Sequence, residues 1–104
     1  MPEVAWLPEA LADAARLRAF LEGKSPSAAA NAAQTLRDGA RLLQRFPELG
    51  SPMNDGTERR ELFLAFGAGA YVLRHRIDGG TVAIIRAWHS REKRDPIKND
   101  QETP

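Results

Sequence analysis

The chain of 104 residues has no cysteine, only two histidines and no apolar run of the roughly 20 residues that a membrane helix needs. Without cysteine it can form neither a disulfide nor a thiolate zinc site. Its N-terminus also lacks the basic and apolar segments of a signal peptide. We therefore predict a soluble, cytoplasmic protein that does not contact a membrane.

Common enzyme signatures are missing as well. The sequence has no glycine-rich phosphate loop followed by lysine and no nucleophile elbow. Its histidines, His75 and His89, fall on different predicted strands, so they are not expected to share a metal ion. We predict no metal and no other cofactor.

Charge is balanced overall but uneven along the chain. Fifteen basic and 14 acidic residues give a net charge of +1, whereas residues 59–94 alone carry eight basic and three acidic side chains. Such a local excess of positive charge usually indicates a surface that binds an anionic partner. From the residues alone, solvated cations, or cations paired with the acids of a partner protein, are the favoured interpretation. The cationic set is Arg59, Arg60, Arg74, Arg76, Arg86, His89, Arg91, Lys93 and Arg94.

The first half of the chain predicts two antiparallel helices. Apolar residues recur at spacings of three and four over residues 9–22, where Leu11 and Phe20 widen the apolar stripe. Ser25 and Pro26 are typical of a helix start, and the alanine-rich pattern that follows continues to Phe46. The connection between the two helices is short, which favours an αα-hairpin.

The second half predicts an antiparallel sheet. Residues 61–66, 71–77 and 82–88 have the branched and aromatic composition of strands, and residues 4–7 could add an edge strand. Together these elements predict an α+β fold of order β-α-α-β-β-β in one domain over residues 1–94. Residues 95–104 are polar and aperiodic, so we expect a frayed tail.

The hairpin register decides which side chains share a face. If Gly79-Gly80 forms a two-residue loop, Ile77 pairs with Val82, His75 with Ile84 and Val72 with Ala87. This register places Trp88 on the face that the helices cover, and it places Arg74, Arg76 and His89 on the open face. A three-residue loop would shift the pairing by one residue.

Two titratable residues within apolar strands favour structural roles. Arg86 lies in the apolar run 82–88, so we expect an ion pair with Glu61 or Glu58 rather than a catalytic role. His75 falls on the predicted core face, where its ring nitrogens should find hydrogen-bond partners. His89 ends a strand, where a side chain can reach solvent or a partner.

The order and spacing of these segments resemble the RelE/ParE superfamily of toxins from bacterial type II toxin–antitoxin systems. The resemblance covers residues 4–94. It implies the β-α-α-β-β-β fold and a cognate antitoxin, which in the ParE branch carries a ribbon-helix-helix DNA-binding part and a C-terminal segment that wraps the toxin. The matching segments are Phe46-Pro47-Glu48-Leu49-Gly50, Arg60-Glu61-Leu62, Tyr71-Val72-Leu73-Arg74-His75-Arg76-Ile77 and Ala83-Ile84-Ile85-Arg86-Ala87-Trp88-His89.

The superfamily has two branches with different targets. RelE-like members are ribosome-dependent mRNA endonucleases that use basic and aromatic side chains, and this set is incomplete here, because Val72 stands where some members have arginine and no tyrosine lies near the C-terminus. The turn after Phe46 and the Trp88-His89-Ser90-Arg91 ending are more similar to ParE-like members, which inhibit DNA gyrase by binding. We therefore expect a ParE-like toxin of a plasmid stabilisation module. A ribosome-dependent endoribonuclease and a degenerate member that only binds antitoxin are the alternatives.

The resemblance assigns the candidate site residues to separate roles. The basic C-terminal segment is the expected target-binding site, and the groove beside the helical hairpin, together with the open-face arginines, is the expected antitoxin-binding site. In the endonuclease alternative His89 would be the general acid or base, assisted by Arg74, Arg76 and Arg91. The target-binding residues are Arg91, Lys93 and Arg94, and the antitoxin-binding residues are Trp6, Leu17, Phe20, Arg74 and Arg76.

Overall fold

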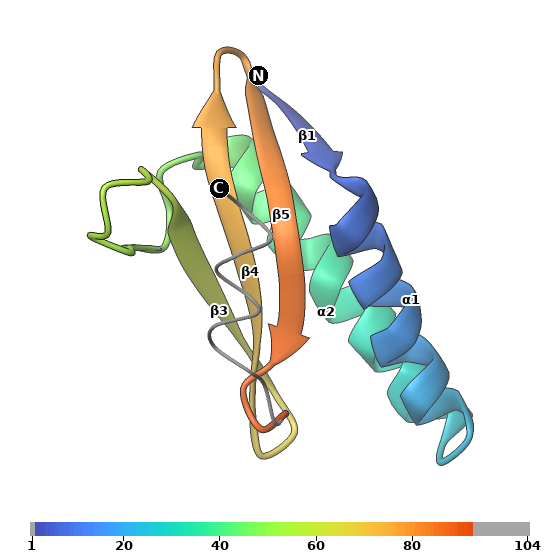
Figure 1. Cartoon of the computed structure of the whole chain (residues 1–104). Coiled ribbons are helices and arrows are strands. Elements are labelled where there is room, and N and C mark those ends of the chain that lie inside the picture. Colours follow the sequence, from blue (N-terminus) through green and yellow to red (C-terminus); the bar gives the residue numbers. More distant parts are fainter. Residues whose placement is uncertain (1, 93–104) are drawn as a thin grey trace.

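Two helices pack on one face of a five-stranded sheet in the computed structural model, which describes residues 2–92 (Figure 1). This architecture confirms the predicted α+β fold. The predicted tail and two of the target-binding residues, Lys93 and Arg94, lie outside the described residues.

The helical hairpin forms as the sequence predicts. Helix α1 spans Pro8–Glu22 and α2 spans Pro26–Arg45. The Ser25 hydroxyl accepts the backbone N–H of Ala28 at 3.2 Å, which satisfies one of the free donors at the start of α2. Close packing of α2 on the sheet depends on Gly39, because a Cβ there would lie 2.5 Å from Leu64 Cδ1. Small residues on α2 thus bring the helix close to the strands.

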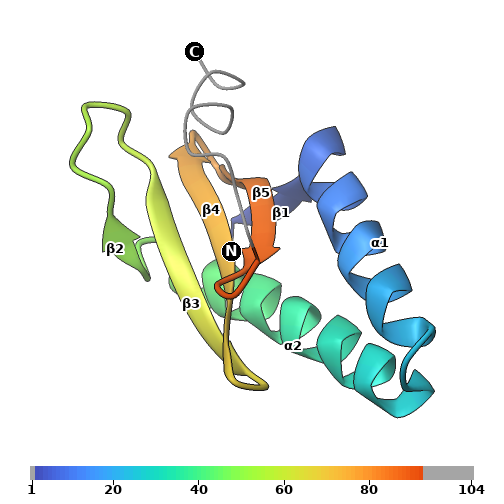
Figure 2. The ribbon, with the colours of Figure 1, turned by 60° about the horizontal axis from the view of Figure 1, so that its bottom comes forward.

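The five strands lie in the order β1-β5-β4-β3-β2 (Figure 2). Strand β1 runs parallel to β5, and all other neighbours are antiparallel. The two-residue strand β2 was not predicted, because a Ser-Pro pair carries no strand pattern. The strand bounds are β1 Glu3–Trp6, β2 Ser51–Pro52, β3 Arg60–Phe66, β4 Gly69–Asp78 and β5 Thr81–His89.

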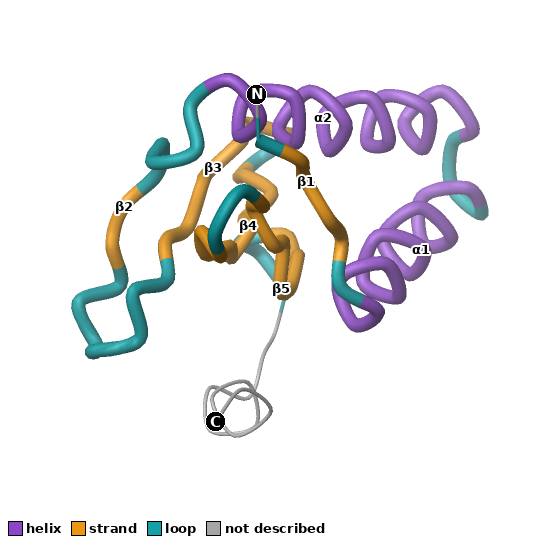
Figure 3. The backbone as a smooth tube through the Cα atoms, turned by 90° about the horizontal axis from the view of Figure 1, so that it is seen from above, coloured by secondary structure: helices purple, strands orange, loops and turns teal. Residues whose placement is uncertain are grey.

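Both helices lie on the same side of the strands, as the view from above shows (Figure 3). The core therefore lies between the hairpin and that face of the sheet. Within residues 2–92 no helix covers the opposite face, which we call the open face. The core cluster comprises Ala10, Leu17, Ala32, Leu36, Leu43, Leu62, Tyr71, Leu73, Val82, Ile84 and Ala87.

A β-bulge in the β4–β5 hairpin corrects the predicted register. Ile77 pairs with Val82 and His75 with Ile84, as expected for the two-residue loop. The next pair is Arg74 with Arg86, so Ile85 is an extra residue without a partner in β4. The predicted pairing of Val72 with Ala87 is therefore wrong, and Val72 pairs with Trp88.

The bulge exchanges the faces of two aromatic side chains. Tyr71 lies opposite His89, and the centroids of these two rings are 5.2 Å apart. Trp88 lies on the open face, where the Arg74 guanidinium is 5.0 Å from its ring centroid. The predicted placement of Trp88 against the helices and of His89 on the open face is wrong, because the bulge shifts the alternation of β5 by one residue.

The buried face of α1 is narrower than the apolar pattern indicated. Leu11 and Phe20, which were expected to widen the stripe, are 56% and 64% exposed. The buried residues of α1 are Ala10, Asp13 and Leu17. An acid therefore occupies a position where the helix meets the sheet.

His75 lies on the core face with partners for its ring nitrogens, as predicted, and it is fully buried. Its Nδ1 lies 3.1 Å from the Leu73 carbonyl oxygen and its Nε2 lies 3.0 Å from the Leu49 carbonyl oxygen. The Leu49 carbonyl is brought there by a sharp turn at Gly50, whose φ of 105° is one that favours glycine. Burial lowers the pKa of His75 below its ordinary value, and the two carbonyl contacts oppose this shift only in part.

Candidate protein-binding groove

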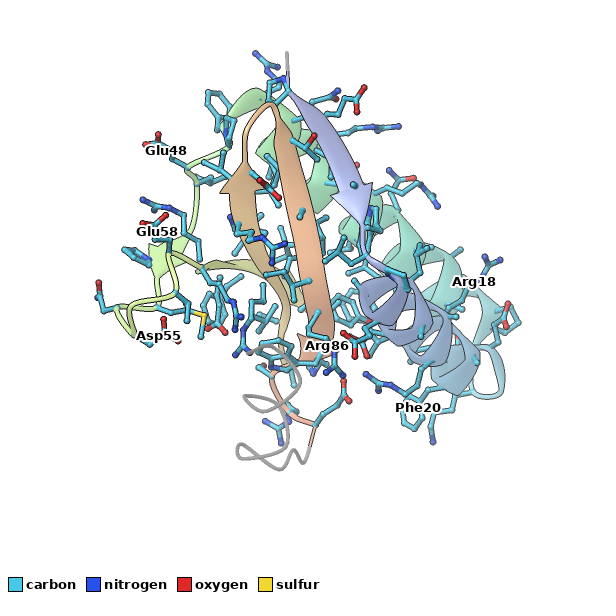
Figure 4. The ribbon with its side chains drawn as sticks, turned by 45° about the horizontal axis from the view of Figure 1, so that its top comes forward. Arg18, Phe20, Glu48, Asp55, Glu58 and Arg86 are labelled. Atoms are coloured by element: carbon cyan, nitrogen blue, oxygen red, sulfur yellow. The ribbon has the colours of Figure 1, made fainter. Side chains whose placement is uncertain are left out.

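An apolar cavity of about 690 Å³ lies between α1 and the ends of β3, β4 and β5. We call it the groove. Phe20 projects from the surface of α1 at this end of the molecule (Figure 4). Apolar side chains line most of the groove, and charged side chains lie at its edge. The lining residues are Arg16, Leu17, Phe20, Leu21, Phe66, Gly67, Ala68, Tyr71, His89, Arg91 and Glu92.

The strand side of the groove is an aromatic cluster. The rings of Phe66 and Tyr71 stack with centroids 4.7 Å apart, and His89 meets Tyr71 edge-on. Burial raises the pKa of Tyr71 above its ordinary value, and the Glu92 carboxylate adds to this shift. The Tyr71 hydroxyl therefore stays protonated at neutral pH and remains a hydrogen-bond donor.

The His89 side chain is held by backbone groups on both ring nitrogens. Nε2 lies 2.9 Å from the Phe66 carbonyl oxygen, and Nδ1 lies 3.2 Å from the backbone nitrogen of Arg91. A neutral imidazole with its proton on Nε2 satisfies both contacts, because Nε2 then donates and Nδ1 accepts. His89 thus fixes the β3–β4 turn to the end of β5.

Charged residues tie the groove edge together. Arg16 Nη1 lies 2.7 Å from Glu92 Oε1, and the other oxygen of Glu92 accepts the backbone N–H of His89 at 2.8 Å. Arg91 is exposed at the same edge. This edge can therefore present a cation to a bound segment while the floor remains apolar.

The two arginines of the open face, Arg74 and Arg76, both lie near acidic side chains. Arg74 donates to Glu61 through Nε at 3.1 Å and through Nη2 at 2.8 Å, and its side chain is only 8% exposed. The more exposed Arg76 lies 4.0 Å from Asp78. Arg74 is thus a structural residue that also stacks on Trp88.

Arg86 forms the expected structural ion pair, but with a different partner. Its Nε lies 2.8 Å from Asp13 Oδ2 on α1, where Figure 4 shows Arg86 at the meeting point of β5 and the helix. The predicted partners were Glu61 and Glu58, and Glu61 instead pairs with Arg74. The sequence did hold a signal for the correct pair, since Asp13 lies three residues after Ala10 and four before Leu17 on the buried helix face.

The structure gathers only part of the predicted site. Leu17, Phe20, His89 and Arg91 line the groove together, whereas Trp6 lies in β1 and packs against the core. The endonuclease set is divided, because Arg74 stacks on Trp88 of the open face while His89 packs against Tyr71. The groove residues that the sequence did not indicate are Arg16, Leu21, Phe66, Tyr71 and Glu92.

Two other features of residues 2–92 do not provide a competing site. A second cavity, of about 540 Å³, is lined by Arg59 and Arg60 but also by Glu48 and Glu58, so its charges offset one another. In the same residues no three metal-ligating side chains cluster together. Neither of the described helices is long and apolar enough to span a membrane.

Comparisons with known proteins identify the relatives of this chain. Residues 4–94 match the family described as the ParE toxin of the type II toxin–antitoxin system parDE. Three relatives from Caulobacter vibrioides are named as toxins. Toxin RelE3 is 37% identical over 84% of this chain and 92% of its own length, Toxin RelE1 is 35% identical over 76% and 83%, and Toxin RelE2 is 33% identical over 86% and 97%.

A solved structure described as the chromosomal ParDE toxin–antitoxin system from P. aeruginosa has the same fold. It superimposes with a TM-score of 0.66 at 21% identity and covers 86% of this chain and 96% of the matched chain. The family match spans nearly all the described residues, and the sequence relatives exceed 30% identity over most of their lengths. The chain therefore belongs to the RelE/ParE superfamily of toxins from type II toxin–antitoxin systems, within the ParE toxin family.

Proposed function

We propose that this toxin acts by binding rather than by catalysis, with DNA gyrase as its target. The observation that carries the proposal is the bonding of His89. Both of its ring nitrogens are engaged by backbone groups of Phe66 and Arg91. A general acid or base must exchange its proton with a substrate, and these contacts would have to break first.

The distribution of the other candidate catalytic residues supports the same proposal. Arg74 is paired with Glu61 and stacks on Trp88, so neither its charge nor its position is directed at His89. An endonuclease would need these groups around one phosphate. A toxin that inhibits by contact needs no such convergence.

The target-binding residues remain those of the basic C-terminal segment, Arg91, Lys93 and Arg94. Of these, Arg91 lies within the described residues and is exposed beside the groove. Exposed cations at the end of a strand can contact an acidic protein surface at little cost in desolvation. We expect their combined removal to weaken inhibition while the fold is retained.

The groove supports neutralisation by an antitoxin encoded beside the toxin. Its apolar floor and exposed Phe20 fit an amphipathic helix from a segment that is disordered alone, and the ParD-like ribbon-helix-helix antitoxins of this branch carry such a segment. Acidic side chains of that segment would meet Arg91, and the exposed part of Arg76 could attract them across the open face. The complex is a hetero-oligomer in this proposal.

Two assays with purified toxin test the target. Gyrase supercoiling should be inhibited, and mRNA on ribosomes should remain intact. His89→Gln should keep most of the inhibition, because a glutamine amide can still donate to the Phe66 carbonyl. Combined Arg91→Ala, Lys93→Ala and Arg94→Ala should lose it, with Arg18→Ala as the control for removing an exposed arginine of α1.

The opposite pattern would identify the endonuclease. General acid–base catalysis typically contributes about 10²- to 10⁴-fold in rate, so a ribonuclease that used His89 would lose nearly all activity as His89→Gln. Ribosome-dependent mRNA cuts that disappear in this variant would overturn the gyrase proposal.

A further inference from the structure

The carboxylate of Asp13 bonds to two consecutive residues of β5. Its Oδ2 accepts the Ala87 backbone N–H at 2.9 Å and the Arg86 Nε at 2.8 Å, and its Oδ1 lies 3.3 Å from Arg86 Nη2. Asp13 is only 5% exposed. A buried carboxylate needs several donors to offset its desolvation, and this one receives its hydrogen bonds from a single short segment of β5, with Nη2 of Arg16 on α1 at 3.6 Å from Oδ1.

The position of these bonds explains why α1 carries a buried acid. Strand β1 pairs with β5 only as far as Trp6 opposite Ile84, so it offers no backbone acceptor to the part of β5 that follows. The bulge at Ile85 comes directly after that point. Asp13 therefore takes the place of a strand partner for Ala87, just beyond the bulge.

The bulge determines which side chains reach the groove. In the observed pairing Leu73 lies opposite Ala87, and Tyr71 lies opposite His89. A regular strand from Ile84 onward would instead place Arg86 opposite the fully buried Leu73 and Trp88 opposite Tyr71. Holding the bulge thus keeps a small side chain in the core and keeps His89 in the groove wall.

We propose that Asp13 is a positioning residue of the groove. Its hydrogen bonds to Arg86 and Ala87 hold the bulged segment of β5 against α1, so that His89 and Arg91 lie in the wall that a bound segment contacts. Asp13 is buried beneath this surface and acts through β5, and its Oδ1 also lies 3.6 Å from Nη2 of Arg16 at the groove edge. The positioning of β5 is independent of the proposed function, and only the effect on antitoxin binding rests on it.

Hydrogen–deuterium exchange of single amides tests the positioning. In Asp13→Ala the ratio of the Ala87 exchange rate to that of Leu73, in the central strand, should rise by about tenfold, which corresponds to the loss of one buried hydrogen bond. Nuclear Overhauser contacts between the Tyr71 and His89 rings should weaken. Leu43→Ala is the control, because it creates a core cavity on α2 and should leave both the ratio and the ring contacts unchanged.

A second variant keeps the test decisive if Asp13→Ala does not fold. Asp13→Asn leaves one acceptor oxygen for the donors of Arg86 and Ala87, so the exchange ratio should rise by about threefold. An unchanged ratio in the variant that folds would overturn the proposal.

A measurement of antitoxin binding distinguishes a failure of this inference from a failure of the proposed function. The affinity for the antitoxin from the neighbouring gene should fall by about tenfold in Asp13→Ala beyond the loss seen in Leu43→Ala. Altered ring contacts with unchanged affinity would overturn the positioning role. If the wild-type toxin itself does not bind the antitoxin, the proposed function fails, and the exchange ratio still decides whether Asp13 pins the bulge.

Discussion

One cation of the groove edge and one cation of the open face differ in their exposure and pairing. Arg74 on the open face is nearly buried and held by Glu61, whereas Arg91 at the groove edge is exposed above an apolar floor. The strands are rich in positive residues, yet the apolar groove lies on the face of the sheet that the helices cover, opposite to the open face. The number of cations in a segment therefore does not locate a binding surface until the pairing of each cation is known.

The largest expected effect tests the structural role of the open face. Glu61→Ala removes the carboxylate from a largely buried pair and leaves the Arg74 charge without it. The free energy of unfolding should fall by about 3 kcal/mol, measured by urea denaturation. Antitoxin affinity of the folded variant should stay unchanged, and a large loss of affinity would mean that the open face is itself a binding surface.

Truncating one exposed phenylalanine in the groove and one outside it compares the two surfaces directly. Phe20 lines the groove, and Phe63 is a similarly exposed residue of β3, so both can be truncated without a core cavity. Phe20→Ala should weaken antitoxin binding by about 2 kcal/mol, as expected for an aromatic anchor, and Phe63→Ala should change it little. Isothermal titration calorimetry measures both, and equal losses would contradict the assignment of the groove.

A smaller effect is expected at the groove edge. Arg16→Gln removes the ion pair with Glu92 and the longer contact with Asp13, and because the Arg16 side chain is about half exposed, stability should fall by only about 0.5 kcal/mol. The freed Glu92 carboxylate should slow association with an acidic segment and change its salt dependence. Stopped-flow association rates at two ionic strengths check this prediction, and Arg18→Gln, which breaks the exposed pair with Glu22 on the same helix, is the matched control.

The smallest effect is the pH dependence of stability that the buried His75 causes. Burial lowers the pKa of His75, so the unfolded chain binds more protons than the folded protein near the ordinary histidine pKa of about 6.5. This contribution to stability is present above that pH and is lost as the pH falls through it. Urea midpoints should decrease from pH 7.5 to pH 5.5, and the decrease should be smaller in His75→Gln. An equal decrease in both proteins would assign the effect to other groups.

Local patterns predicted the elements and the topology class correctly. The helix start at Ser25, the two-residue loop at Gly79-Gly80 and the alternation of β4 each depend on neighbours in sequence, and each is observed. Even the structural role of Arg86 followed from a charged residue within an apolar strand. Strand β2 was not predicted, because its two residues carry no local sequence signal for pairing with β3.

The fold, the superfamily and the charged residues available for binding could all be inferred from the amino-acid sequence. Which of these residues are exposed at a binding surface, and which face each occupies, depends on contacts between distant parts of the chain. The decisive step was the pairing of Asp13 with Arg86 and Ala87 across more than 70 positions of the chain, together with the bulge beside it. A bulge is set by long-range packing and hydrogen bonding rather than by local propensity, and one extra residue turns every following side chain to the other face. For that reason Trp88 and His89 could be identified from the sequence but not placed.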